Sequence, residues 1–207
     1  MLQQARIAIE NTQLRNVEFR QADATDLREM PSGSFDAVVC AAALLYMPVQ
    51  RALTEWWRLL RPGGTIGFST MCKGSPQAGE LFRDCAAEFG VRLEDPSAAL
   101  GSESAASAAL RTAGFVQITV IADRVLLSDA DFSCAWESNL HSAAPGDIRS
   151  LAPTRLDVLR SRFEQALAER RHDVPSFAAA DVLYAYGTKP ATGDAERPNT
   201  DQLAHPS

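Results

Sequence analysis

The stretch that decides the fold is Phe35-Asp36-Ala37-Val38-Val39-Cys40-Ala41, a nearly continuous apolar run. Such runs are typical of a strand that is buried on both faces of a sheet. A similar run covers residues 65–70, and residues 48–60 between the two predict a helix with its apolar side chains on one side. Pro62-Gly63-Gly64 would end that helix. Two buried strands joined by a helix predict neighbouring strands of a parallel sheet.

The alternation of strands and helices continues towards the C-terminus. Residues 116–127 and 181–188 predict two further strands, and a helix before the first of them would end at Ala113 with Gly114 as its terminator. We expect an α/β fold with a mostly parallel sheet, helices on both faces, and an antiparallel end formed by the last two strands.

A predominantly helical insertion, residues 129–171, separates the last two predicted strands. An apolar stripe runs along its second half and consists of Leu156, Leu159, Phe163 and Leu167. We expect the insertion to cover a substrate pocket as a cap, with Phe132 and Trp136 in its roof. Residues 1–190 would then form one domain, and residues 191–207, which are rich in Pro, Thr, Asp and Asn, a disordered tail.

Towards the N-terminus, residues 1–10 predict a helix that is already under way, since no capping residue precedes it. Val17 to Gln21 then predict a short strand that ends at Asp23. In a parallel α/β sheet, ligands bind beyond the carboxyl ends of the strands. Asp23 and the residues after Cys40 are therefore the places to look for a site.

The composition restricts the function classes. The 207 residues suit one domain, and 46% of them are hydrophobic, which is enough for a substantial core. The formal charge of −6 and the lack of Lys or Arg runs disfavour nucleic acid or an anionic membrane as a partner. No segment resembles a signal peptide or a membrane-spanning helix, so we expect a cytoplasmic protein that acts on a small molecule.

The metal-ligating residue types do not gather into a motif. The four cysteines contain no CxxC pair, and they are Cys40, Cys72, Cys85 and Cys134. The three histidines are equally far apart: His141, His172 and His205. We expect buried reduced thiols and no metal site.

Asp23 and Ala24 have two interpretations. A carboxylate after a strand can accept a hydrogen bond from an exocyclic amine, and the next backbone N–H can donate to a ring nitrogen, which together would recognise the edge of an adenine. Alternatively, Asp23 only caps the turn before Leu27. The residue spacing does not separate the two.

The segment that follows residues 35–39 also has two interpretations. The small residues from Cys40 to Ala43 would let a ligand approach the backbone closely, with Leu44, Leu45 and Tyr46 as a pocket wall. The same residues are also typical of plain core packing, and composition alone favours that interpretation.

Three motifs, in order, resemble class I S-adenosylmethionine-dependent methyltransferases, especially the ubiquinone-biosynthesis and small-molecule branch. Residues 16–24 (NVEFRQADA) resemble the third-strand motif of that family, and residues 35–39 (FDAVV) its fourth-strand motif. Residues 59–64 (LLRPGG) resemble the loop before its fifth strand. The resemblance covers about residues 1–128 and 180–190, and it matches the insertion only in position.

The resemblance implies S-adenosyl-L-methionine as the cofactor and a Rossmann-like sheet. Asp23 would bind the adenine amine, and Ala24 would supply the neighbouring N–H. Cys40 and Ala41 would lie along the methionine and sulfonium, and Tyr46 near the face where the methyl group is transferred. The reaction would be an in-line displacement in which the protein aligns the partners and excludes water.

The sequence departs from the family pattern at its start. The family's first two strands and its Gly-rich loop, which cradles the amino-acid end of the cofactor, have no counterpart here, and no GxGxG occurs. In the family's strand order the missing strands lie between residues 17–21 and 37–41. Either these two segments pair directly, or another chain fills the gap, or the sequence is a fragment with Met1 internal to a longer product; we expect the last.

His141 is the candidate general base, with Glu137 behind it; the alternative is a surface histidine. Two rival functions stay open. A non-catalytic, degenerate methyltransferase fold that acts as a partner or scaffold would explain the missing loop. A nicotinamide oxidoreductase fits less well, because its phosphate-binding loop would also be absent.

Overall fold

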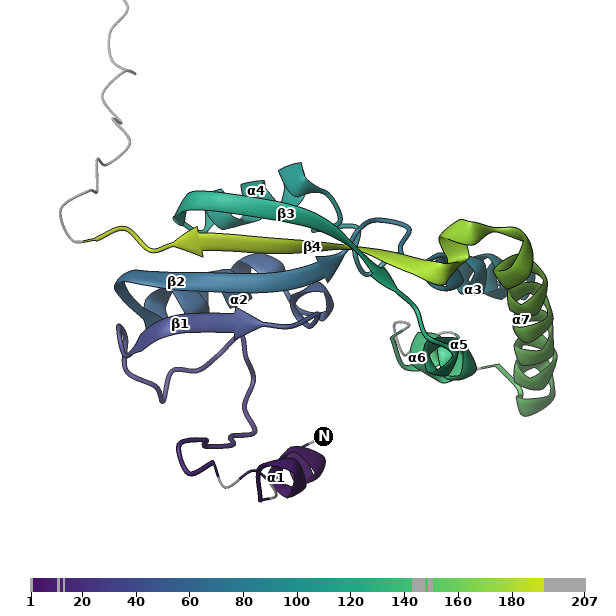
Figure 1. Ribbon diagram of the computed structural model, residues 1–207, viewed down its shortest axis with the longest axis horizontal. Helices are drawn as coiled ribbons and strands as arrows, with labels where there is room; N and C mark the ends of the chain where they lie inside the picture. The colour runs from purple at the N-terminus through teal and green to yellow at the C-terminus, as the bar shows by residue number, and fades with distance from the viewer. Residues whose placement is uncertain (1, 11, 13, 143–147, 149–150, 192–207) are drawn as a thin grey trace, which may run out of the picture.

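The computed structural model describes residues 2–10, 12, 14–142, 148 and 151–191, and it has two lobes (Figure 1). One lobe is built on a β-sheet, and the other is helical. The elements in chain order are α1 (Leu2–Glu10), β1 (Phe35–Cys40), the 3-10 helix η1 (Leu44–Tyr46), α2 (Val49–Leu59), β2 (Leu60–Met71), α3 (Gln77–Glu88), α4 (Glu103–Thr112), β3 (Val116–Leu126), α5 (Asp129–Ser133), α6 (Ala135–Ser142), α7 (Pro153–Asp173), the 3-10 helix η2 (Pro175–Ala178) and β4 (Ala179–Thr188).

The sheet has four strands in the order β1-β2-β4-β3. β1 pairs with β2 in parallel, whereas β4 runs antiparallel to both of its neighbours, β2 and β3. Three strands therefore share one direction and β4 opposes them, which confirms the antiparallel end. The parallel pair is joined through α2, because parallel neighbours need a crossover connection.

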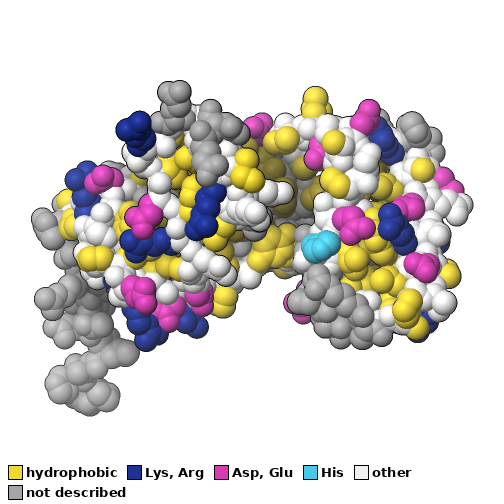
Figure 2. Space-filling model, turned by 90° about the horizontal axis from the view of Figure 1, so that it is seen from below, with side chains coloured by type: hydrophobic (Ala, Val, Ile, Leu, Met, Phe, Trp, Pro, Cys, Tyr) yellow, Lys and Arg dark blue, Asp and Glu magenta, His cyan; other side chains and the backbone are white. Residues whose placement is uncertain are grey.

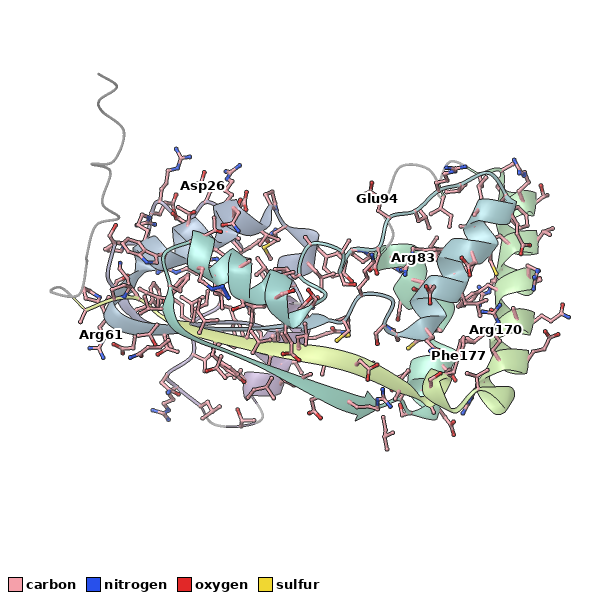
Figure 3. The ribbon with its side chains drawn as sticks, turned by 90° about the horizontal axis from the view of Figure 1, so that it is seen from above. Asp26, Arg61, Arg83, Glu94, Arg170 and Phe177 are labelled. Atoms are coloured by element: carbon pink, nitrogen blue, oxygen red, sulfur yellow. The ribbon has the colours of Figure 1, made fainter. Side chains whose placement is uncertain are left out.

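The main core lies between the sheet and two helices, α2 and α4, which cover the same face (Figure 3). From the strands, Ile66 and Phe68 point into this core, and both are buried. Leu53 and Trp56 of α2 and Leu110 of α4 meet them there. The helix before β3 ends as expected, since Gly114 has a φ of 90° and the N–H of the next residue donates back into the last turn.

The opposite face of the sheet is largely uncovered. Val39 on β1 is 81% exposed, Ile121 on β3 is 50% exposed and Tyr186 on β4 is 41% exposed. Figure 2 shows hydrophobic side chains at the surface of this lobe. The expectation that residues 35–41 are buried on both faces is therefore wrong, because β1 is an edge strand with helices on one side only.

The strand expected at Val17 to Gln21 does not form, and that prediction is wrong. A strand requires a hydrogen-bonded neighbour, and within the described parts of the chain this segment has none. The segment does not pair directly with β1 either, because β1 pairs only with β2 among the strands described. The apolar alternation is present, but it has no sheet to join.

The helical lobe has its own core, in which α3 packs against α6 and α7. Three aromatic rings form its centre: the centroid of Phe82 lies 5.5 Å from that of Trp136 and 5.4 Å from that of Phe163. Trp136, expected in the roof of a pocket, is only 5% exposed. The lobe thus includes α3 in addition to the insertion.

The start of α3 is fixed by a contact outside the helix. The N-cap is Pro76, and the hydroxyl of Ser75 accepts a hydrogen bond from the backbone N–H of Asp181 at 2.7 Å. Across the described residues, every helix is too short or too polar to span a membrane. The tail expected from residue 191 lies, beyond that residue, outside the described part.

Candidate functional site

The loop after residues 17–21 carries the first candidate group, the carboxylate of Asp23. Its Oδ1 accepts hydrogen bonds from the backbone N–H and the hydroxyl of Thr25, both at 2.8 Å. These hydrogen bonds favour the charged form and hold the pKa of Asp23 below its ordinary value. The other oxygen, Oδ2, has no hydrogen-bond partner among the residues that the structure describes.

The backbone of Ala24 completes this arrangement. Its carbonyl oxygen accepts a hydrogen bond from the indole Nε1 of Trp56 at 2.8 Å. Its N–H finds no acceptor within the described ranges. One carboxylate oxygen and one adjacent amide are thus left for a ligand, while the other oxygen of Asp23 shapes the turn. The two interpretations of Asp23 are compatible, since each uses a different oxygen.

An open hollow of about 610 Å³ adjoins this loop. Its lining is mostly polar and consists of Arg20, Gln21, Ala22, Asp23, Asp26, Leu27, Arg28, Glu29 and Met30. Asp26 is paired with Arg28 at 2.5 Å, so part of the charge in the lining is already neutralised. Ala24 is not part of the lining.

The carboxyl end of β1 is the second candidate. The thiol of Cys40 packs in the core, where burial raises its pKa against hydrogen bonds from the N–H groups of Ala43 and Leu44. Cys40 therefore has only its backbone to offer a ligand. Ala41 is exposed and, with Cys40, lines an apolar groove of about 320 Å³ on the uncovered face of the sheet.

Ala42, two residues after the end of β1, has a φ of 49°, which is uncommon for a residue with a Cβ. Its N–H donates to the hydroxyl of Ser69 on β2 at 3.0 Å, and this contact fixes the turn. Backbone strain of this kind often occurs at functional sites. Ala42 is exposed, and whether a ligand approaches its backbone stays a prediction.

The remaining predicted residues lie elsewhere. Tyr46 is 56% exposed in η1, and His141 is exposed on α6 in the helical lobe. The Nδ1 of His141 lies 2.6 Å from the backbone carbonyl of Glu137, whose carboxylate is 3.7 Å from Arg160. Asp23 and the Cys40–Ala41 pair line different hollows, and Tyr46 and His141 line neither of those two.

Sequence reasoning missed the residues that hold the Asp23 loop. Glu55, Trp56 and Arg58, all on α2, make side-chain hydrogen bonds to the backbone of residues 24–30. Trp56 was assigned only to the apolar side of the helix. The polar pair Glu55 and Arg58, three residues apart on that helix, was the available signal.

Comparisons with known proteins agree with this fold. Residues 1–68 match the family model described as a methyltransferase domain. A ubiquinone biosynthesis O-methyltransferase from Acinetobacter baylyi is 31% identical over 90 residues, which are 43% of this chain and 37% of the relative. One from Pseudomonas fluorescens is 35% identical over 79 residues, 38% of this chain and 33% of the relative. The matched part is about a third of the length of these curated relatives.

Two solved structures share the fold over most of the chain. A candidate methyltransferase from Bacillus halodurans has a TM-score of 0.57 at 16% identity, covering 92% of this chain and 79% of its own. The YcgJ protein from Bacillus subtilis has a TM-score of 0.57 at 18% identity, covering 92% and 78%. Residues 1–68 are thus similar to a methyltransferase domain, and the chain shares the Rossmann-like fold of these solved structures.

Proposed function

We propose that this chain takes part in S-adenosylmethionine-dependent methyl transfer to a small-molecule acceptor, and that Asp23 and Ala24 bind the adenine of the cofactor. The observation that carries the proposal is the pairing of one free acceptor with one free donor on adjacent residues. Adenine presents an amine and a ring nitrogen side by side, which is the complementary pattern. The name of the relatives, ubiquinone biosynthesis O-methyltransferase, supports a small-molecule acceptor.

The residues fit one end of the cofactor. The lowered pKa of Asp23 keeps its carboxylate charged at neutral pH, as an acceptor for the adenine amine must be. For the amino-acid end, the sequence contains no GxGxG, and we assign no residue of this chain to that end. The backbone at Cys40 and Ala41 is our proposal for the region of the methionine and sulfonium, with Tyr46 near the face where the methyl group is transferred.

When bound, the cofactor supplies an electrophilic methyl group. The chain's own part is to hold the nucleobase, to align the acceptor and to exclude water. A base for the acceptor's proton is proposed at His141. The carbonyl of Glu137 can only accept, so Nδ1 is the donor in that contact, and in a neutral imidazole Nε2 would be the nitrogen that accepts a proton.

A second candidate function is a non-catalytic partner protein with a methyltransferase fold. The observation that favours it is the uncovered sheet face, where Val39 is 81% exposed and the groove beside it is apolar. Such a face is typical of a surface that another protein covers. This candidate predicts no affinity for the cofactor.

Calorimetric titration with S-adenosylhomocysteine, the demethylated cofactor, tests the proposal and separates the two candidates. We expect binding by the unaltered chain and about tenfold weaker binding by Asp23→Asn, because one charge-assisted hydrogen bond is lost. Asp36→Asn is the matched control, since this exposed carboxylate is paired with Arg61 and lies in neither hollow. No heat at millimolar ligand would favour the non-catalytic protein.

A further inference from the structure

We infer that Trp56, Glu55 and Arg58 of α2 are positioning residues for adenine recognition, because they fix the loop that carries Asp23 and Ala24. This inference rests on the proposed function and assigns side chains that act through the loop. All three donate to or accept from backbone groups of residues 24–30.

The contact of Trp56 acts directly on the recognition pair. Its indole N–H donates to the carbonyl of Ala24 at 2.8 Å, and the side chain is 4% exposed. That carbonyl belongs to the same planar peptide unit as the N–H of Thr25. The N–H of Thr25 in turn donates to Oδ1 of Asp23. Fixing the peptide plane therefore fixes the direction of the Asp23 carboxylate.

Glu55 and Arg58 hold the next part of the loop. Oε1 of Glu55 accepts from the N–H of Leu27 at 2.7 Å, and a guanidinium nitrogen of Arg58 donates to the carbonyl of Leu27 at 3.0 Å. Arg58 also donates to the carbonyl of Met30 at 2.9 Å. Both backbone groups of Leu27 are thus held by one helix.

The two side chains also hold each other. Arg58 donates to both carboxylate oxygens of Glu55, at 2.7 and 2.8 Å, and their side chains are 30% and 14% exposed. Such a two-point pair is geometrically specific. The hydrogen bond to Arg58 is the largest cause of the lowered pKa of Glu55. The pair therefore presents a defined surface to the loop.

The loop depends on α2 because no sheet holds it. Residues 17–23 form no strand in the structure, and no strand in the described part of the chain pairs with them. α2 itself is anchored on the sheet by Ala52 and Leu53, which are fully buried in the core beneath the sheet. Asp26, labelled in Figure 3, lies on the helix-covered side of the sheet, as an attachment to α2 requires. The sheet thus fixes the position of α2, and α2 fixes the position of the loop.

Nucleobase selectivity distinguishes positioning from mere stabilisation. The probes are S-adenosylhomocysteine and S-inosylhomocysteine, in which a carbonyl replaces the amine that Asp23 would bind. We expect the unaltered chain to prefer the adenine compound by about tenfold or more, because the inosine carbonyl repels a carboxylate. Trp56→Phe keeps an aromatic ring but removes the indole N–H together with part of the buried side-chain volume. Its preference should fall to about twofold or less.

Trp57→Phe is the matched control. Trp57 neighbours Trp56 on α2, and its buried Nε1 has no hydrogen-bond partner among the described residues. This variant should keep the full preference. If Trp56→Phe fails to fold, the preference is measured on Arg58→Lys instead. A lysine cannot donate to the carboxylate and both carbonyls at once. The preference of this variant should fall as well.

The outcomes separate the two levels of the proposal. A selective wild type with equally selective Trp56→Phe and Arg58→Lys variants would overturn the positioning role and leave the proposed function intact. Equal weakening for both probes would overturn it too, because that result indicates loss of folded protein only. A wild type that binds neither probe would overturn the proposed function together with this inference.

Discussion

The ammonium group of Lys189, just after β4, lies 3.9 Å from the ring centroid of Trp57 on α2. It also donates to the carbonyls of Trp57 and Leu60, at 2.9 and 2.7 Å. The carbonyls in the last turn of a helix receive no hydrogen bond from N–H groups of the same helix. A cation at a helix C-terminus is also favoured by the helix dipole. The residue that follows β4 thus contacts the end of the helix whose side chains hold the Asp23 loop.

Replacing Lys189 with Met should lower the free energy of unfolding by about 2 kcal/mol, because two charge-assisted hydrogen bonds and a cation–π contact are lost. Chemical denaturation followed by tryptophan fluorescence measures the change. Lys73→Met is the control, since Lys73 is exposed and its ammonium group has no hydrogen bond to any described residue. Equal stability of the two variants would contradict the assigned role.

Val39→Thr should change the free energy of unfolding by less than about 0.5 kcal/mol, because the side chain of Val39 is 81% exposed. Ile66→Ala, on the neighbouring strand but fully buried, should cost about 3 kcal/mol. Thermal and urea unfolding of both variants test the asymmetry between the two faces. A large cost at Val39, or a change of oligomeric state, would mean that this face is covered in solution.

Local sequence signals predicted most of the fold because their causes are local. The apolar runs at β1 and β2, the helix terminator at Gly114 and the apolar stripe of α7 depend only on nearby residues. The strand at Val17 to Gln21 failed for a different reason. Strand formation depends on a neighbour that the pattern itself does not contain.

The site was predicted less completely than the fold. Asp23 and Ala24 were proposed from their place after an apolar stretch, and each keeps one hydrogen-bonding group without a partner among the residues that the structure describes. The Trp56 contact joins residues that are 32 apart in the sequence. A pattern that counts Trp56 only as an apolar side chain does not predict that its indole N–H donates a hydrogen bond. The separation of Asp23 from Ala41 into two hollows depends on tertiary packing, which no single motif determines.

Asp95 should make the chain sensitive to acid. Burial raises the pKa of this carboxyl, but hydrogen bonds from Ser97 and Gly74 and the nearby Arg83 together outweigh burial and leave the pKa below its ordinary value. The unfolded chain therefore binds more protons, and the stabilisation is lost as the pH falls below about 4. Figure 3 shows Arg83 on the side of α3 that faces the sheet, and its guanidinium lies 3.6 Å from the carboxylate of Asp95.

Asp95→Asn should lower stability at pH 7 by about 1–2 kcal/mol and flatten the dependence of stability on pH between about pH 5 and 3. Urea unfolding over that range is the measurement. Asp84→Asn is the comparison, because no ion pair of Asp84 is found among the described residues. If both variants keep the wild-type acid profile, Asp95 is not the group that carries the effect.

Phe163→Ala should unfold or loosen the helical lobe, at a cost of about 3–5 kcal/mol, because Phe163 is fully buried against Phe82 and Trp136. Val158→Ala, on the same helix but 59% exposed, should cost less than about 0.5 kcal/mol. The fluorescence of Trp136 reports the change directly. Affinity for S-adenosylhomocysteine should be retained, since the adenine-binding loop is attached to α2 in the other lobe. A parallel loss of affinity would show that the cofactor site extends into the helical lobe.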